Sequence, residues 1–259
     1  MTLDMYQIDA FTTELFRGNP AAVVPLSEWL QDDVMQKIAA ENNLSDTAFF
    51  VGKKGQYDLR WFTPLAEVNL CGHATLASAW VICYRLNDKE NTLRFQTRSG
   101  ELIVSRAENS LIMDFPSNPA YQCEPPAKLI EAISVQPQEV LQAEDYFVVL
   151  ENEQQVLAMK PDLRLLKHIP LRAVVVTAPS DRVDFVSRMF APKLGIDEDP
   201  VTGSSHCSLT PYWVERLGRT KLAARQLSSR GGELQCELIG DRVKLIGQCV
   251  EYMQATINI

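Results

Sequence analysis

Hydrophobic and polar residues alternate at the start of the chain, which is the pattern of a half-buried β-strand. The segments "MYQIDAF" and "NPAAVVPL" are predicted as neighbouring strands, joined by a turn at "FRGNP". Leu30, Val34 and Ile38 then recur at helical spacing, so we expect a helix over residues 28–42 with Ser27 as its cap. The apolar runs "TAFFV" and "YDLRWFTP" follow as two further strands.

A stretch of small and apolar residues, "NLCGHATLASAW", introduces a second predicted helix over residues 73–86. This helix has almost no polar face, which in a soluble protein indicates burial on all sides. The segments "TLRFQT" and "ELIVSRAENSLIMDF" after it are predicted as antiparallel strands joined by tight turns.

The second half of the chain repeats this order of elements. Two strands, "LRAVVVTAP" and "DFVSRMFAP", lead through a predicted loop, "KLGIDEDPVTGSSH", into a helix through "PYWVERLG". Pro211 lacks an N–H and is expected to kink or divide that helix. The strands "RQLSSRGGELQCELIG" and "RVKLIGQCVEYMQATI" follow.

Three short motifs recur in the same order in the two halves. "RWFTP" matches "RMFAP", "CGHATLASAW" matches "TGSSHCSLTPYW", and "RSGEL" matches "RGGEL". Ordered matches of this kind indicate a duplicated unit. We therefore predict an α+β fold of two similar halves, each a mixed sheet curled around a central helix. The halves are placed at residues 1–118 and 119–259, with an approximate boundary and a last strand that can pair with the first half.

Composition and charge remove several classes of function. The net charge of -8 and the scattered lysines and arginines argue against a nucleic-acid partner. No apolar run is long enough to span a bilayer, and no signal peptide is visible. The six cysteines lie apart without CxxC pairs, which favours free thiols in a reducing compartment, so a cytoplasmic protein is expected.

The two matched turns contain the candidate chemistry. Gly72 and Gly203 each open a helix, whose first amides have no partner within the helix and favour a small anion, particularly a carboxylate. The alternative is that both glycines only permit tight turns. Asp46 stands at the entrance of an apolar strand, where a carboxylate is costly to desolvate. It can supply a proton for catalysis, or it can be an ordinary turn residue.

Cys71 and His73 have two further readings, a pair of thiols and a metal site. Thr202 occupies the place in the second half that Cys71 has in the first, so racemisation by two thiols is not expected. Only two other histidines are available, and no second pair has ligand spacing, so we expect no metal.

Five ordered motifs, "GNPAAVV", "LSDTAFF", "RWFTP", "CGHATLA" and "EDPVTGSSH", make the chain resemble the PhzF-like phenazine-biosynthesis isomerases over about residues 5–255. The resemblance implies a diaminopimelate-epimerase-like fold, two pseudo-symmetric barrel-like halves with the active site between them, no cofactor, and a homodimer. It implies Asp46 as the general acid/base, supported by His73, Asp199 and Ser204. The substrate would be bound by Asn19, Gly72, Ala74, Thr202, Gly203 and Ser205.

One residue departs from that family's pattern, because the phenazine enzyme has glutamate where this chain has Asp46. A base must lie within hydrogen-bond reach of the proton it moves, so a side chain shorter by one methylene matters. The leading hypothesis is a cofactor-independent isomerase that moves a proton on a small carboxylate-bearing metabolite. The alternative is a non-catalytic protein that binds small anions on the same scaffold.

Overall fold

Strand β1 lies between β2 and the C-terminal strand β18 in the first of two units into which the chain divides. The computed structural model describes all residues 1–259, and its units are Met1–Phe115 with Leu245–Ile259, and Pro116–Lys244. The elements of the first unit are β1 (Thr2–Ala10), β2 (Asn19–Leu26), α1 (Asp32–Asn42), β3 (Asp46–Lys53), β4 (Gln56–Phe62), β5 (Glu67–Val68), α2 (Gly72–Tyr84), β6 (Thr92–Thr97), β7 (Gly100–Ala107), β8 (Ser110–Pro116) and β18 (Cys249–Asn258).

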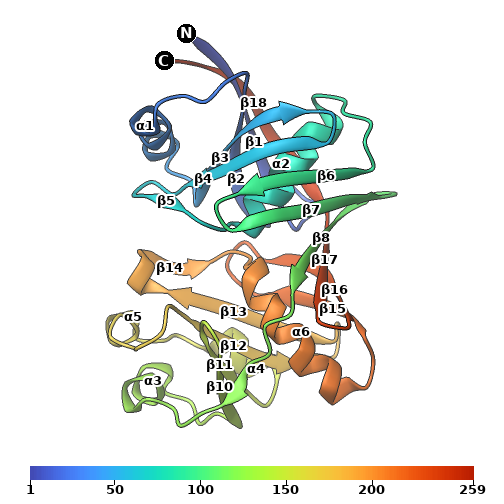
Figure 1. Cartoon of the computed structure of the whole chain (residues 1–259). Helices are drawn as coiled ribbons and strands as arrows, with labels where there is room; N and C mark the ends of the chain where they lie inside the picture. The colour runs from blue at the N-terminus through green and yellow to red at the C-terminus, as the bar shows by residue number, and fades with distance from the viewer. The chain divides into compact units, whose positions relative to one another are not determined.

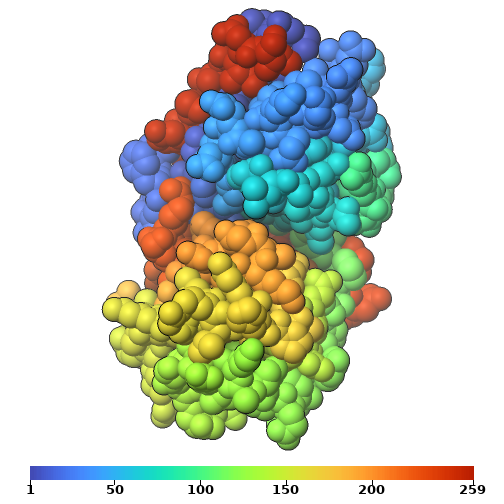
Figure 2. Space-filling view, turned by 90° about the vertical axis from the view of Figure 1, so that its left-hand side faces the viewer, coloured from blue at the N-terminus to red at the C-terminus, as the bar shows by residue number.

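The sheet of the first unit is mixed. Strand β1 pairs antiparallel with β2 and with the C-terminal strand β18, so the two ends of the chain lie side by side (Figures 1 and 2). Strand β2 runs parallel to β3, β3 antiparallel to β4, and β4 antiparallel to β5 but parallel to β6. Strands β6, β7 and β8 form an antiparallel meander, as predicted.

Helix α2 is the core of this unit and packs against β1, β2, β3 and β18 (Figure 1). Ten of its 13 residues are buried, as its lack of a polar face predicts. The hydroxyls of Thr75 and Ser78 donate to the carbonyls of Cys71 and Ala74 at 2.6 and 2.7 Å. These polar side chains are therefore satisfied inside the helix itself, and no water is needed beside them.

The second unit contains β9 (Tyr121–Gln122), α3 (Ala127–Ile133), β10 (Glu139–Gln142), β11 (Tyr146–Val149), α4 (Glu153–Ala158), α5 (Leu163–Leu166), β12 (Val174–Pro179), β13 (Phe185–Ala191), the 3-10 turn η1 (Pro192–Leu194), β14 (Ile196–Asp199), α6 (Gly203–Leu217), β15 (Lys221–Gln226) and β16 (Gly232–Ile239). Strand β17 (Arg242–Gly247) leads back to the first unit.

The pairing pattern of the second unit repeats that of the first. Strand β10 is antiparallel to β11, β11 parallel to β12, and β12 antiparallel to β13. Strand β13 is antiparallel to the short β14 and parallel to β15, which is antiparallel to β16. Helix α6 follows β14 as α2 follows β5, and Gly72 and Gly203 are the first residues of the two helices. The duplication predicted from three motifs is thus present in the topology.

Two local predictions were wrong. The helix expected over residues 28–42 begins at Asp32, and Gln31 instead of Ser27 is its cap residue. Trp29 and Leu30 pack against the apolar core beside α1, so this segment contributes contacts without helical backbone. The loop expected after β13 contains η1 and β14, because its polar residues form a strand that pairs with Met189 and Ala191.

Pro211 does not divide the second buried helix, because α6 runs unbroken from Gly203 to Leu217. A proline at this position cannot donate to the carbonyl of Cys207, four residues earlier. That carbonyl accepts a hydrogen bond from the backbone N–H of Asn118 at 3.1 Å instead. A tertiary bond therefore replaces the helical bond that the proline removes.

All six cysteines are free, in agreement with the prediction. No helix of the chain combines the length and apolar character needed to cross a membrane.

Asp88, in the loop between α2 and β6, holds that loop in place by hydrogen bonds. Its carboxylate accepts hydrogen bonds from the Tyr57 hydroxyl at 2.7 Å and from the amides of Gly55 and Glu90 at 2.9 Å each. Burial would raise the pKa of Asp88, but these bonds and the nearby Arg106 outweigh it and hold the pKa below 3.8. The ionised carboxylate therefore stabilises the fold above about pH 4, and this contribution is lost as the pH falls through the folded-state pKa.

We predict that Asp88→Asn lowers the free energy of unfolding by about 1–2 kcal/mol at pH 7. The difference from the wild type should shrink below about pH 4, where the wild-type carboxylate itself becomes protonated. Urea denaturation at several pH values measures both effects. The matched control is Asp58→Asn, an exposed residue of β4, which should change little. If Asp88→Asn lowers the free energy of unfolding by the same amount at every pH, the ionised Asp88 carboxylate is not the source of the stabilisation.

Candidate active site

Asp46, Cys71 and His73 come together in the first unit and are here called the Asp46 cluster. Asp46 is the first residue of β3, Cys71 precedes α2, and His73 lies in its first turn. The His73 Nε2 atom is 3.6 Å from Asp46 Oδ2, and the Cys71 sulfur is 3.5 Å from His73 Nδ1. Each of the three residues is only 7% exposed. The structure thus joins Asp46 and His73, which the resemblance pairs, and adds Cys71.

Burial determines the charge of His73, because desolvation lowers the pKa of this imidazole to about 3. His73 is therefore neutral at neutral pH and can donate one hydrogen bond and accept another. A neutral imidazole beside a carboxyl group suits an exchange of hydrogen-bond roles when that group gains or loses a proton.

The start of α2 has no capping side chain. Its first residues, Gly72, His73 and Ala74, therefore present backbone amides that no cap satisfies, and the helix dipole adds a partial positive charge there. Asn19, the other predicted binding residue of this unit, is fully buried at the start of β2. It lies two residues before Ala21, which pairs with Asp46 in the register of the sheet.

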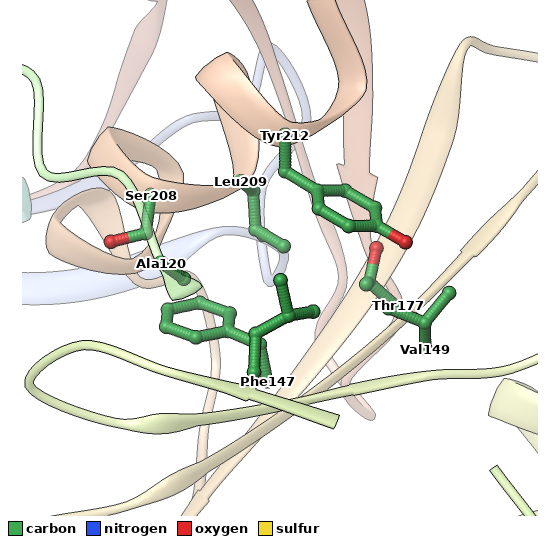
Figure 3. Close-up of a pocket in the computed structure, with 8 residues that line it drawn as sticks. Ala120, Phe147, Val149, Thr177, Ser208, Leu209 and Tyr212 are labelled. Carbon is green, nitrogen blue, oxygen red and sulfur yellow. The ribbon is translucent and has the colours of Figure 1, made fainter. Parts of the chain in front are cut away.

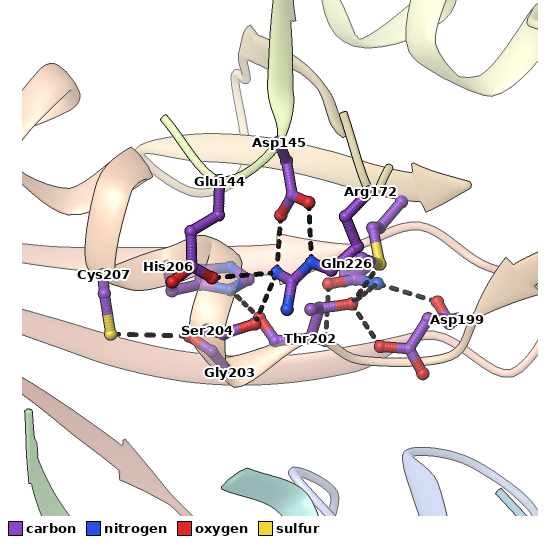
Figure 4. A network of polar contacts seen from close by, with 11 residues as sticks. Glu144, Asp145, Arg172, Asp199, Thr202, Gly203, Ser204, His206, Cys207 and Gln226 are labelled. Atoms are coloured by element: carbon purple, nitrogen blue, oxygen red, sulfur yellow. Dashed lines mark hydrogen bonds and ion pairs between the residues drawn. The ribbon is translucent and has the colours of Figure 1, made fainter. Parts of the chain in front are cut away.

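Asp199 and Thr202 come together in the second unit. The Thr202 hydroxyl donates to the Asp199 carboxylate and lies 3.3 Å from the sulfur of Met189 (Figure 4). Gln226, at the end of β15, binds this turn by three hydrogen bonds: it accepts from the Thr202 amide at 2.8 Å and donates to the Asp199 carbonyl at 2.8 Å and to the Thr202 hydroxyl at 3.1 Å. The turn before α6 is thus held rigidly.

Ser204 lies next to a buried ion pair. Arg172 donates two hydrogen bonds to the carboxylate of Asp145, at 2.9 and 2.8 Å, and its Nη2 atom is 3.4 Å from the Ser204 hydroxyl (Figure 4). The Asp145 side chain is 2% exposed and Arg172 is 35% exposed. The two hydrogen bonds to Asp145 fix the guanidinium group of Arg172. This group therefore restricts the positions that the neighbouring Ser204 hydroxyl can take.

The other residues of this helix start are more deeply buried. Gly203 and Ser205 are buried, and the Ser205 hydroxyl has no hydrogen-bond partner. His206 binds the Thr202 carbonyl through Nδ1 at 2.7 Å, and burial lowers its pKa to about 4. His206 is therefore a neutral donor that fixes the backbone of the turn.

Sequence reasoning missed Gln226, Arg172 and Asp145. None lies within a recognisable motif, and each is far in sequence from the "DPVTGS" turn that it supports. The remaining signal is weak, because it consists only of a polar residue at the start of a predicted strand, Gln226 in "RQLSSRGGELQCELIG" and Arg172 in "LRAVVVTAP".

Cys71 and Thr202 occupy equivalent places, since each is the cap residue of the buried helix in its unit. The nearest later thiol, Cys207, is buried inside α6, and burial raises its pKa to about 12. A protonated thiol at that depth is a poor base, which agrees with the prediction against racemisation by two thiols.

One apolar crevice lies elsewhere in the second unit, beside α6. It encloses about 190 Å³, part of it open to solvent, yet the side chains leave too little room for a water molecule. Figure 3 shows Phe147, Leu209 and Tyr212 closing it together. Its lining has no charged group, so it offers no site for an anionic metabolite.

Comparison with known proteins agrees with these features. The family model for phenazine biosynthesis-like proteins (PhzC-PhzF) matches residues 8–255. A protein of Pseudomonas aeruginosa named as an uncharacterized isomerase is 52% identical, with all of both chains covered. The crystal structure of a PhzF family phenazine biosynthesis protein from Enterococcus faecalis superimposes with a TM-score of 0.97 at 45% identity, again over all of both chains.

A more distant structure has the same fold. A hydroxyproline epimerase from Agrobacterium vitis gives a TM-score of 0.63 at 8% identity, over 99% of this chain and 92% of its own. The predicted family resemblance and the epimerase-like α+β fold of two similar halves are therefore confirmed.

We predict that Gln226→Leu lowers the free energy of unfolding by about 1–3 kcal/mol, because the buried Thr202 amide loses its hydrogen bond to the Gln226 side chain. Hydrogen exchange at residues 199–204 should accelerate beyond the change expected from the lost stability. Gln235→Leu, an exposed glutamine on the neighbouring strand β16, is the control. Equal effects of the two variants would show that the three hydrogen bonds of Gln226 contribute little.

Proposed function

Because the chain belongs to the phenazine biosynthesis-like (PhzC-PhzF) family, which includes proteins named as isomerases, we propose that it is a cofactor-independent isomerase. Its reaction would move a proton from one position to another on a small carboxylate-bearing metabolite. Asp46 would take the proton from the first position and deliver it to the second.

The contact between Asp46 and His73 is the observation that carries this proposal. Asp46 is 7% exposed and lies at the edge of an apolar strand, 3.6 Å from a neutral imidazole. The His73 imidazole is neutral, so it can donate a hydrogen bond to an ionised carboxyl group or accept one from a protonated carboxyl group as the proton moves. His73, whose Nε2 atom lies 3.6 Å from Asp46 Oδ2, would position the carboxyl group in both states.

The substrate carboxylate would bind at a helix start. The amides of Gly72, His73 and Ala74 are uncapped, and the dipole of α2 favours negative charge there. Asn19 would add a polar contact from β2. The start of α6, with Thr202, Gly203 and Ser205, has the same construction and is assigned the same type of role.

Asp199 and Ser204 would act in the second unit as polar groups that orient substrate. Gln226 fixes the turn that contains Asp199, and Arg172 restrains the Ser204 hydroxyl. Polar groups that are already held in place need little reorientation when charge develops in the transition state, which lowers its free energy.

The short side chain of Asp46 favours a second candidate, a non-catalytic protein that binds small carboxylates. Both candidates predict binding, and only the first predicts proton exchange. The cytoplasm is the proposed location, supported by the six free thiols, and a homodimer is proposed from the family alone.

We predict that Asp46→Asn abolishes the exchange of solvent deuterium into substrate, because the amide can neither take nor deliver the proton. Candidate substrates come from a thermal-shift screen of amino and hydroxy acids, and nuclear magnetic resonance then measures deuterium incorporation. Thermal stabilisation by the same compound should remain, since the binding amides belong to α2.

Two further variants complete this test. Asp46→Glu, which restores the carboxylate of the phenazine enzyme, should retain measurable exchange, and Asp58→Asn on β4 should behave as wild type. Exchange that persists in Asp46→Asn would remove Asp46 from the mechanism. Stabilisation by a carboxylate without exchange at any pH would establish the binding protein instead.

A further inference from the structure

The Asp46 cluster has a second chemical property beyond proton transfer, because its three residues offer three different metal-binding atoms. A thiol sulfur, an imidazole nitrogen and a carboxylate oxygen lie within 4.8 Å of one another. They come from two elements, β3 and the start of α2, so the sheet and the helix fix their relative positions. Asp46 is distant from the other two in sequence, which is why their spacing alone gave no sign of a metal site.

The distances are close to those between ligands of one zinc ion, although slightly longer. Zinc bond lengths of about 2.3 Å to sulfur and about 2.0–2.1 Å to nitrogen and oxygen place tetrahedral ligands roughly 3.3–3.6 Å apart. In the structure, His73 Nε2 is 3.6 Å from Asp46 Oδ2 and 3.9 Å from the Cys71 sulfur. The first separation is long for a hydrogen bond but close to the spacing of two ligands on one metal.

The identity of the donors selects the type of metal. Thiolate and imidazole favour Zn²⁺ and similar borderline ions over Mg²⁺ and Ca²⁺, which prefer oxygen ligands. Three protein ligands leave a fourth tetrahedral position open. The nearly buried position of the cluster reduces competition from bulk water for the ion.

We propose that Asp46, Cys71 and His73 form a Zn²⁺ site whose occupation inhibits the enzyme. Bound zinc would coordinate the oxygen of Asp46 that otherwise moves the proton, and it would displace the thiol proton of Cys71 into solvent. The protein would then be active without the metal and inactive with it. The inhibition rests on the proposed function, whereas the binding of zinc does not.

Zinc binding is tested on the full chain by equilibrium dialysis against Zn²⁺ held at micromolar levels by a competing chelator. We expect one ion per chain for the wild type. Cys71→Ala should weaken binding by at least roughly 100-fold, since loss of an outer-shell partner of a metal ligand already costs about 10–100-fold. The matched control is Cys83→Ala, a buried thiol on the same helix, about 18 Å away at 1.5 Å per residue, which should bind as wild type.

Cobalt gives an independent reading of the ligands. Co²⁺ bound to the wild type should show a thiolate-to-metal charge-transfer band and the visible bands of tetrahedral cobalt. The charge-transfer band should be absent from Cys71→Ala. The thermal stability of metal-free Cys71→Ala shows whether that variant is folded. Absence of binding by the wild type, or equal binding by wild type and Cys71→Ala, would overturn the site.

Inhibition is measured separately on the deuterium-exchange reaction. Zn²⁺ should stop exchange in the wild type, and a chelator should restore it. The exchange rate of Cys71→Ala, taken relative to its own rate without zinc, should be unchanged at Zn²⁺ concentrations that stop exchange in the wild type. Zinc that binds at Cys71 without slowing exchange would refute inhibition alone, and loss of the proposed function would leave the dialysis result unchanged.

Discussion

The burial of α2 on all sides is the constraint on which the rest of the first unit depends. A helix without a polar face must be enclosed, and β1, β2, β3 and β18 enclose it. The last residue of β17, Gly247, approaches this helix closely, because an added Cβ would lie 2.6 Å from Phe11 and 2.9 Å from Leu76.

The same constraint creates the chemistry of the site. A buried helix begins among other residues and not in water, so the groups at its first turn must be satisfied by the protein or by a ligand. The two units solve this differently. Thr202 is bound into a network with Asp199 and Gln226, whereas Cys71 and His73 lie beside a single carboxyl group. Three hydrogen bonds from Gln226 hold the first arrangement, and the second brings a thiol and an imidazole to one carboxyl group.

Local patterns in the sequence predicted most of the fold. Alternation and apolar runs identified several strands, the missing polar face identified α2, and three repeated motifs predicted the shared topology of the units. No element was predicted between residues 119 and 170, where β9–β11 and α3–α5 lie. The start of α1 was misplaced because Leu30 has helical spacing from Val34 and Ile38 yet packs on the core without helical backbone. Pro211 was misread because the bond that compensates for it comes from Asn118, and no local rule contains such a partner.

The site was predictable only where its residues lie in motifs. The resemblance named Asp46, His73, Asp199 and Ser204, but the structure was needed to bring Asp46 to Cys71 and His73. Gln226 and the ion pair of Arg172 with Asp145 depend on contacts between distant segments. Side chains that support a site from another strand leave no periodic signal, since their own strands would form equally well with other residues at those positions.

The pairing of β18 with β1 has a consequence for folding during synthesis on the ribosome. The second unit is continuous in sequence, so all of its residues leave the exit tunnel in one passage. The first unit, although synthesised first, lacks its last strand until the final residues emerge. During synthesis β1 therefore has an open edge, and α2 is covered on one side fewer than in the finished protein. The proposed base, Asp46, thus belongs to the part of the chain that is made early and completed last.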